Sequence, residues 1–368
     1  MNNSIFTPNY STTPEIEFHL EGIDRNRWLI ERMLLMPKHQ AWLHREVRVS
    51  RAAGTTRIEG AELGEEAVSR LAKQALPGTV TEDERDNINA LQAYEFIDFL
   101  SDQGDIPVVE LVIRQLNRYL IATAAAPRTP GAYRKGRNTV GNFTPPDQGD
   151  APGLMRAFAL WLRNDDDGLH PVLKAGIAHL HLVAIHPFWD GNGRTARGLQ
   201  TLLLQRSPFG FRKLLSLESF LLNLKGDYFA SIQRTLGSTF TEDYDATPWL
   251  EFCTLVLKIC SDDLVAKMTD WHRMMQQLHD MWAAKGWPQR HADAYAFAVQ
   301  AGQITRSDYI EITGVAPVTA SRDLAEMTNA GVLVPEGKTR RRIYRPAPLE
   351  NLVGHQTPQE QLSLLVDP

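Results

Sequence analysis

The sequence predicts a mainly α-helical protein with one short β-hairpin and a small C-terminal unit of helices and strands. Through most of its 368 residues, apolar side chains recur every three or four positions, which is the spacing of amphipathic helices. Prolines, glycines and capping residues stand between these segments, where helices begin and end. Residues 131–146 and 332–344 instead have the turn glycines and β-branched residues that are typical of paired strands.

The composition limits the class of protein. A formal net charge of −5 and a pI near 6.1 give no overall signal for nucleic-acid binding, so any DNA contact must come from a local patch. Cys253 and Cys260 are too few for a disulfide framework, and we expect two buried thiols. No apolar run approaches a membrane span, and the polar N-terminus does not resemble a signal peptide. The sequence therefore predicts a cytoplasmic protein that does not enter a membrane.

Residues 1–105 form the first predicted region. Residues 1–21 are rich in Asn, Ser, Thr and Pro, and we expect them to be extended. Helical spacing follows over residues 24–53, and Pro37 divides it into two helices. The pattern then reaches Glu59, which by periodicity alone is a solvated acid before a helix-ending glycine.

Residues 106–265 form the second predicted region, a helical core. A capping box at Thr81 and Glu84 opens the last helix before it. The core itself begins with a helix over residues 107–122, whose apolar residues carry no obvious chemistry and are expected to be buried.

A loop of twelve residues, from His186 to Arg197, is the centre of this core. The helix predicted over residues 171–185 stops at Pro187, so His186 lies at a helix end. Helical spacing returns after the loop, and Asp190 therefore stands near the N-terminus of a second helix.

Free N–H groups and the helix dipole make such an N-terminus a binding site for anions. Gly191 and Gly193 lack side chains that would keep a phosphate away from this backbone, and Asn192 can donate a hydrogen bond to a phosphate oxygen. Arg194 and Arg197 lie three positions apart on one face of the helix and can grip phosphates. The loop therefore predicts a polyphosphate site.

Two further residues of the loop suggest a reaction. Asp190 is a hard oxygen ligand suited to Mg²⁺, which usually takes one or two carboxylates together with phosphate oxygens. His186 can act as a general base for an incoming hydroxyl. The alternative, a plain turn beside a solvated helix, does not explain eight constrained positions in twelve residues.

This loop resembles the signature of the Fic family, His-x-Phe-x-Asp/Glu-Gly-Asn-Gly-Arg-x-x-Arg, at every fixed position. The resemblance implies transfer of AMP from ATP to a Ser, Thr or Tyr hydroxyl of a target protein, with Mg²⁺. It makes His186 the base and Asp190 the metal ligand. The remaining implied roles are the anion hole (Gly191, Asn192, Gly193), phosphate binding (Arg194, with Arg197 at the γ-phosphate) and the loop anchor (Phe188). The related Doc branch, which phosphorylates its targets, usually has Lys where this chain has Gly193.

Two other segments resemble parts of the same family. Thr55, Glu59 and Gly60 match an inhibitory motif, which implies that Glu59 pairs with Arg197 and repels the γ-phosphate. The same glutamate could orient a water that removes AMP. Whether it acts within its own chain or on a neighbour stays open.

Residues 131–146 predict a hairpin, with Thr139 and Val140 in a strand and Gly141 at the turn. Alone, this could be a plain surface loop, but it resembles the family's flap, which aligns the target by main-chain pairing. Tyr228 and Phe229, placed just before another helix, would lie near the adenine base; burial in the core is the alternative.

The C-terminal third predicts a connecting helix over residues 266–290, a compact unit over residues 291–347 and a tail over residues 348–368. Helix, turn, helix and strand pair describe a winged helix. Its recognition helix would begin within residues 319–324, and basic residues gather in the wing (Lys338, Arg340, Arg341, Arg342). DNA contact and protein contact both remain open for this unit.

The sequence thus predicts a Fic-type helical protein with a C-terminal winged helix, acting as a protein adenylyltransferase that Glu59 restrains. Its partners would be ATP and a protein hydroxyl, its own included, and a homodimer stays open. Two alternatives remain. One is a Fic enzyme that uses another nucleotide or removes AMP, and the other is a winged-helix regulator whose Fic domain senses a nucleotide.

Overall fold

The structure is a computed structural model that describes residues 5–35, 37–73, 80–122, 129–164, 168–337 and 342–348. The chain forms two compact units. The larger comprises Met1–Leu34 and Trp42–Ala266, and the smaller comprises Leu35–Ala41 and Lys267–Pro368. Apart from residue 348, the predicted tail lies outside the described residues.

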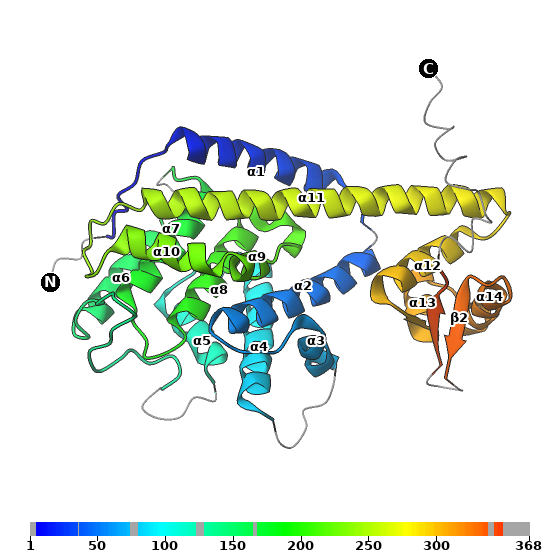
Figure 1. Cartoon of the computed structure of the whole chain (residues 1–368), viewed down its shortest axis with the longest axis horizontal. Coiled ribbons are helices and arrows are strands. Elements are labelled where there is room, and N and C mark those ends of the chain that lie inside the picture. Colours follow the sequence, from blue (N-terminus) through cyan, green and yellow to red (C-terminus); the bar gives the residue numbers. More distant parts are fainter. Residues whose placement is uncertain are drawn as a thin grey trace. The chain divides into compact units, whose positions relative to one another are not determined.

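The larger unit is built from helices (Figure 1). They are α1 (Pro14–Arg32), α2 (Pro37–Ile58), α3 (Glu65–Lys73), α4 (Glu82–Asp102), α5 (Glu110–Leu120), α6 (Ala151–Leu162), α7 (Pro171–Ile185), α8 (Asn192–Arg206), the short η1 (Pro208–Lys213), α9 (Leu217–Asn223), α10 (Lys225–Leu236) and the first part of α11 (Thr247–Ala284). Helix α8 packs against α4, α5 and α7. Both α7 and α8 are buried along almost their whole length, so the loop between them stands on a rigid core.

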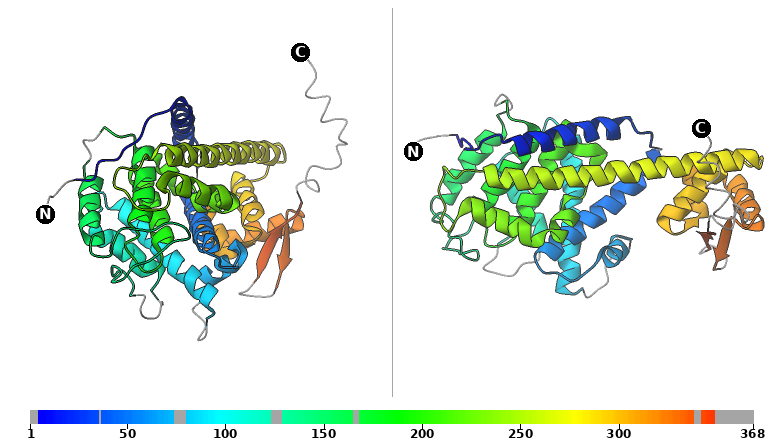
Figure 2. Two further views of the ribbon diagram at one scale, coloured as in Figure 1. Left: turned by 60° about the vertical axis from the view of Figure 1, so that its left-hand side comes forward. Right: turned by 45° about the horizontal axis from the view of Figure 1, so that its top comes forward.

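Helix α1 corrects the prediction that residues 1–21 are extended, because it already begins at Pro14. The Thr13 hydroxyl accepts a hydrogen bond from the Ile16 N–H at 3.3 Å, and Pro14 occupies the first turn, where proline is tolerated. Helix α1 runs beside α11 (Figures 1 and 2). Buried polar contacts hold the two helices together, since Asn26 Nδ2 donates to Ser261 Oγ at 3.0 Å.

Helix α11 corrects a second prediction. The connecting helix expected at residues 266–290 is not a separate element. It is the second part of one uninterrupted helix, Thr247–Ala284, which begins in the predicted core. No proline or glycine stands between Trp249 and Ala284 to break it, and Gly286 follows its end in a left-handed conformation.

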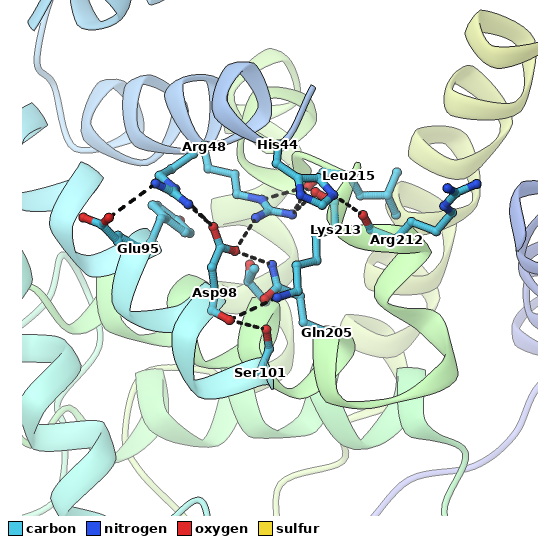
Figure 3. A network of polar contacts seen from close by, with 12 residues as sticks. His44, Arg48, Glu95, Asp98, Ser101, Gln205, Arg212, Lys213 and Leu215 are labelled. Atoms are coloured by element: carbon cyan, nitrogen blue, oxygen red, sulfur yellow. Dashed lines mark hydrogen bonds and ion pairs between the residues drawn. The ribbon is translucent and has the colours of Figure 1, made fainter. Parts of the chain in front are cut away.

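Helix α2 is fixed to the core by a network of polar contacts around Asp98 of α4 (Figure 3). Asp98 Oδ2 accepts from Arg48 Nε at 3.1 Å and from Arg48 Nη2 at 2.8 Å. Arg51 Nη1 lies 3.5 Å from Asp98 Oδ1, and Arg51 Nε donates to the Leu215 carbonyl at 2.9 Å. Because Arg51 is buried, this carboxylate is the counter-charge that allows α2 to dock, and α2 carries the segment that ends at Glu59.

Replacing Asp98 with alanine is expected to lower the free energy of unfolding of the larger unit by about 3–5 kcal/mol, because it leaves a buried arginine without its counter-charge. Glu95 is the matched control: it is 71% exposed and lies 3.8 Å from Arg48, so Glu95→Ala should change stability by less than about 0.5 kcal/mol. Urea denaturation followed by circular dichroism measures both. Equal losses in the two variants would contradict the assignment.

The smaller unit combines helices with a three-stranded sheet. Its elements after α11 are α12 (Gln289–Ala301), β1 (Ile304–Thr305), α13 (Arg306–Thr313), α14 (Pro317–Asn329), β2 (Leu333–Glu336) and β3 (Ile343–Pro346). The strand order is β1-β3-β2 and all pairs are antiparallel, with Ile304 opposite Tyr344 and Pro335 also opposite Tyr344. The predicted strand pair is therefore present, and β1, which was not predicted, adds a third strand.

Helix α14 does not present all of its predicted recognition residues outward. Asp323 is fully buried and accepts two hydrogen bonds from Arg290, at 2.6 and 3.1 Å, and one from the Tyr309 hydroxyl at 3.0 Å. This residue therefore joins α12, α13 and α14 rather than facing a partner. The wing residues Lys338, Arg340 and Arg341 lie outside the described residues.

The cysteine prediction holds, since Cys253 and Cys260 are both buried and do not form a disulfide. Within the described ranges, no helix combines the length and the apolar character that crossing a bilayer requires.

Candidate active site

His186 closes α7 in an unusual conformation. Its φ of 48° and ψ of 54° are left-handed, which is uncommon for a residue with a side chain, and its N–H still donates to the Leu182 carbonyl at 3.0 Å. Pro187 cannot continue the helix. The chain therefore turns sharply at His186, as the sequence predicts, and the imidazole stands at the edge of the loop.

The protonation of His186 follows from its contacts. Nδ1 lies 3.3 Å from the Val183 carbonyl oxygen, which can only accept, so Nδ1 carries the hydrogen and Nε2 is the acceptor of a neutral ring. Burial lowers the pKa of His186 to about 4; the positive charge of Arg134 acts in the same direction, while the Val183 carbonyl, Glu59 and Asp190 oppose it. The ring is therefore neutral at physiological pH.

This low pKa predicts a pH dependence for a reaction in which His186 is the general base. A base must be neutral to act, so such an activity would be lost only as the pH falls through the folded pKa of about 4. We expect kcat/KM of a Glu59→Gly variant to stay within about twofold between pH 7 and 5, whereas a histidine with an ordinary pKa would lose about 25-fold. An initial-rate profile at saturating Mg²⁺ measures this, and an acid limb between pH 6 and 7 would contradict it.

Phe188 and Asn192 fasten the loop to the core. Phe188 is fully buried, and its ring packs against Tyr133 with the centroids 5.6 Å apart. The Asn192 amide spans the loop, since Oδ1 accepts from the Phe188 N–H at 3.0 Å and Nδ2 donates to the Phe188 carbonyl at 2.9 Å. Because both groups of the Asn192 side chain are bonded to Phe188, the predicted phosphate contact would be made by its backbone N–H.

A side chain at either glycine of the α8 N-terminus would meet a neighbour. Gly191 is the N-cap with φ of 75°, and a Cβ there would lie 2.7 Å from Ile121 Cγ2. A Cβ on Gly193 would lie 2.7 Å from Glu59 Oε1. The N–H groups of this first turn have no partners within the helix, so the backbone is suited to bind an anion.

Asp190 lies beside this turn. Its Oδ1 accepts from the Gly191 N–H at 2.6 Å and from Arg194 Nη2 at 3.3 Å, and the side chain is about one-third exposed. A partly exposed carboxylate next to a turn suited to bind phosphate fits Mg²⁺, which would complete its coordination with phosphate oxygens and water.

Each arginine of the loop is paired with a carboxylate from the N-terminal region. Arg194 Nη1 donates to Asp86 Oδ2 on α4 at 3.1 Å, and Arg197 Nη2 donates to Glu59 Oε1 just beyond α2 at 2.6 Å. Sequence reasoning found Glu59 but missed Asp86, because an isolated aspartate in the first turns of a helix has no distinctive signal.

The contact between Glu59 and Arg197 lies within one chain. Arg197 is buried, while the Glu59 side chain is 39% exposed. Thr55 adds two acceptors: its Oγ1 lies 2.9 Å from Arg197 Nε and its carbonyl 3.1 Å from Nη2. Burial opposes ionisation of Glu59, but the charge and hydrogen bond of Arg197, with the charge of Arg194, hold its pKa below the usual value. The pair is therefore ionic at neutral pH.

The predicted hairpin is a single bridge with a tight turn. Val140 and Phe143 exchange both backbone hydrogen bonds, at 2.9 and 3.0 Å, and Gly141 has φ of 56°. Thr139, Val140 and Gly141 are all exposed. The backbone of Thr139 and Gly141 is therefore placed at the surface, where a second segment can reach it.

Arg134 and Asn117 join this flap to the loop, and sequence reasoning assigned neither a role. Arg134 Nε donates to the His186 carbonyl at 2.8 Å, and its Nη2 donates to the Pro146 carbonyl. Asn117 on α5 donates to the Asp190 carbonyl at 2.9 Å and accepts from the Gly131 N–H at 3.0 Å. Both residues are buried, which makes them part of the frame that holds the loop. Arg134 belongs to the segment that resembles the flap, whereas Asn117 has no distinctive signal in the sequence.

Tyr228 and Phe229 lie inside α10, and not before a helix as predicted. Tyr228 is buried, and its hydroxyl contacts His179 Nε2 at 3.0 Å and Arg197 Nη1 at 3.3 Å. Phe229 is 46% exposed. Of this pair, only Phe229 presents an accessible ring to a nucleotide base.

Part of this chain is similar to known proteins. Residues 108–204 match the Fic/DOC family. Over 80 residues the chain is 46% identical to proteins named protein adenylyltransferase Fic from Drosophila virilis and Drosophila yakuba, and the matched segment covers 22% of this chain and 16% of each fly protein.

Solved structures share the fold. A Fic family protein from Desulfovibrio desulfuricans G20 superposes with a TM-score of 0.63 at 22% identity, covering 93% of this chain and 99% of the other. Fic-1 of C. elegans gives a TM-score of 0.58 at 20% identity, covering 70% and 73%. Residues 108–204, which contain the loop from His186 to Arg197, are therefore the part of this chain that is similar to the Fic/DOC family.

Proposed function

We propose that this protein transfers AMP from ATP to a Ser, Thr or Tyr hydroxyl of a target protein, and that Glu59 restrains this activity. One observation carries the proposal: His186 presents an unprotonated Nε2 at the edge of a loop whose other face is a helix N-terminus with two arginines. A base, an anion site and a metal ligand are what nucleotidyl transfer needs.

In the reaction, the target hydroxyl donates its proton to His186 Nε2 while its oxygen attacks the α-phosphorus of ATP. The bond from the α-phosphorus to the bridging oxygen breaks, and pyrophosphate leaves with the electron pair. The first-turn N–H groups of α8 and Arg194 stabilise the charge on the phosphates, and Arg197 holds the γ-phosphate. Asp190 would hold Mg²⁺, which neutralises phosphate charge when it is bound.

Restraint follows from the ion pair. With Glu59 Oε1 at 2.6 Å, Arg197 Nη2 is occupied, and the carboxylate places a negative charge where a γ-phosphate must lie. ATP can then bind only with its phosphates displaced from in-line geometry. The contacts within one chain favour restraint in cis. The reverse reaction remains the alternative, since the same carboxylate could orient a water toward an AMP-modified hydroxyl.

The exposed backbone on either side of Val140, at Thr139 and Gly141, is the proposed docking edge for the target, because Val140 itself is already paired with Phe143. An extended segment pairing with this edge would bring its hydroxyl over the loop, because Arg134 ties the base of the flap to His186. Phe229 is the proposed contact for the adenine base, given its exposed ring.

Mass spectrometry tests the nucleotide and the acceptor together. Glu59→Gly protein is incubated with lysate, Mg²⁺ and one of several nucleoside triphosphates, and modified peptides are sequenced. We expect an adenylyl group on a Ser, Thr or Tyr oxygen with ATP and none with EDTA. A different nucleotidyl group would assign another donor, and no adduct with any nucleotide would favour the sensor hypothesis.

For the smaller unit we propose a winged helix. The order helix, strand, two helices, two strands, with the sheet order β1-β3-β2, supports this proposal. Among the described residues, Arg322 pairs with Glu326 at 3.6 Å and Arg345 with Glu336 at 2.8 Å, so these two cations are partly neutralised. A contact with protein is therefore proposed ahead of one with DNA.

A further inference from the structure

A chain of buried hydrogen bonds runs from Arg197 into the core, away from Glu59. Arg197 Nη1 lies 3.3 Å from the Tyr228 hydroxyl, which lies 3.0 Å from His179 Nε2. His179 Nδ1 lies 2.7 Å from Gln200 Oε1, and Gln200 Nε2 lies 3.1 Å from Cys253 Sγ. All five side chains are buried, so each contact must satisfy its partner without help from solvent.

The direction of this chain can be deduced. A guanidinium can only donate, so the Tyr228 oxygen accepts from Arg197. The Tyr228 proton then goes to His179 Nε2, and Nδ1–H goes to Gln200 Oε1. The reverse order would aim two donors at the Tyr228 oxygen and turn its own buried proton away from both neighbours, at a cost in free energy. Burial also lowers the pKa of His179 to about 3, which keeps the ring neutral.

Tyr228 and Glu59 therefore act on Arg197 in different ways. Glu59 is an anion that occupies the nucleotide side of the guanidinium, whereas Tyr228 is a neutral acceptor on another nitrogen. If Glu59 leaves, Tyr228 and Thr55 still fix the plane of the guanidinium. A neutral acceptor orients the group without repelling a phosphate.

We infer that Tyr228 is a positioning residue that keeps Arg197 aimed at the terminal phosphate of the nucleotide, and that His179 and Gln200 keep Tyr228 in its accepting orientation. This inference rests on the proposed function, because it takes Arg197 to hold the γ-phosphate. It also moves Tyr228 from the predicted adenine contact to the phosphate end of the site.

The test compares ATP with ADP. The parent is Glu59→Gly/His186→Ala, in which turnover is blocked, and Tyr228→Phe is added to it. In isothermal titration with Mg²⁺ present, we expect Tyr228→Phe to raise the Kd for ATP about tenfold, because one hydrogen bond to a charged group is lost. The Kd for ADP should stay within about twofold of the parent's.

Tyr244→Phe is the matched control. Tyr244 is also buried and also bonds a histidine of α7, with its hydroxyl 2.9 Å from His181 Nδ1, but this contact belongs to a different pair. Both variants lose one buried hydroxyl, so a general loss of stability affects both, and Tyr244→Phe should leave both Kd values unchanged. Gln200→Met is a second probe, expected to raise the ATP Kd by about threefold.

The outcomes separate the two levels of the argument. If the parent binds ATP more tightly than ADP, and Tyr228→Phe behaves like Tyr244→Phe, the inference about Tyr228 is wrong while the proposed function stands. If the parent does not distinguish ATP from ADP, the proposed role of Arg197 fails, and the inference fails with it.

Discussion

Replacing His186 with alanine in the Glu59→Gly background is expected to lower the rate of AMP transfer about 10²- to 10⁴-fold, the usual contribution of a general base. The affinity for ATP should change by less than about threefold, because His186 Nε2 faces the attacking hydroxyl and the phosphates are held by α8. Initial rates with a fixed protein acceptor and titration calorimetry measure the two quantities.

A structural effect can be told apart from the loss of the base. His186 fills the left-handed position at the end of α7, so His186→Asn, which tolerates that conformation, serves as a control for the backbone. It should be as inactive as His186→Ala while matching the parent in thermal stability. Activity retained by either variant would show that another group takes the proton.

Replacing Glu59 with glycine is expected to raise the rate of AMP transfer about 10- to 100-fold, since it frees Arg197 from a charge-assisted hydrogen bond. The gain should appear in kcat more than in KM, because restraint misplaces bound ATP rather than excluding it. Glu62→Gly is the matched control, an exposed acid just past the same helix end, and it should leave the rate unchanged.

Two results would contradict this account of Glu59. Equal rates for wild type and Glu59→Gly would show that the ion pair does not limit the reaction. Removal of AMP from a modified protein by wild type, lost in Glu59→Gly, would make the glutamate part of the reverse reaction instead.

The loop from His186 to Arg197 could be predicted because its signals are local. A proline ends α7 and glycines begin α8, and its charged residues lie close together because they are close in the sequence. The ion pair between Glu59 and Arg197 joins segments that are far apart in the sequence. It could be predicted only because residues 55–60 resemble a known motif.

The contacts that packing creates were not predictable. Asp86 and Asn117 have the pattern of ordinary helix residues, and Tyr228 was predicted near the adenine base. Their contacts with the loop appear only when α4, α5 and α10 are placed around α8. The side chain of Asn192 was also predicted incorrectly from its residue type and place in the loop. They indicate a phosphate ligand, but in the fold the amide makes two hydrogen bonds to the backbone of Phe188.

Two errors in secondary structure have similar causes. The polar composition before residue 21 indicated no helix, so the N-cap at Thr13 was not recognised. Helix α1 is stabilised by burial against α11 rather than by its own helix propensity. Strand β1 has two residues, too few for any periodicity, and exists because Ile304 pairs with Tyr344 on β3.

The most direct test of the central claim follows the label of ATP. Wild type, Glu59→Gly and Glu59→Gly/His186→Ala are incubated with Mg²⁺, lysate and ATP labelled at the α- or the γ-phosphate, and label on protein is measured. The predicted result is strong α-label on protein with Glu59→Gly, weak α-label with wild type and none with the double variant. No γ-label should appear with any of the three. Transfer of γ-label would contradict it, since the loop would then be phosphorylating its target.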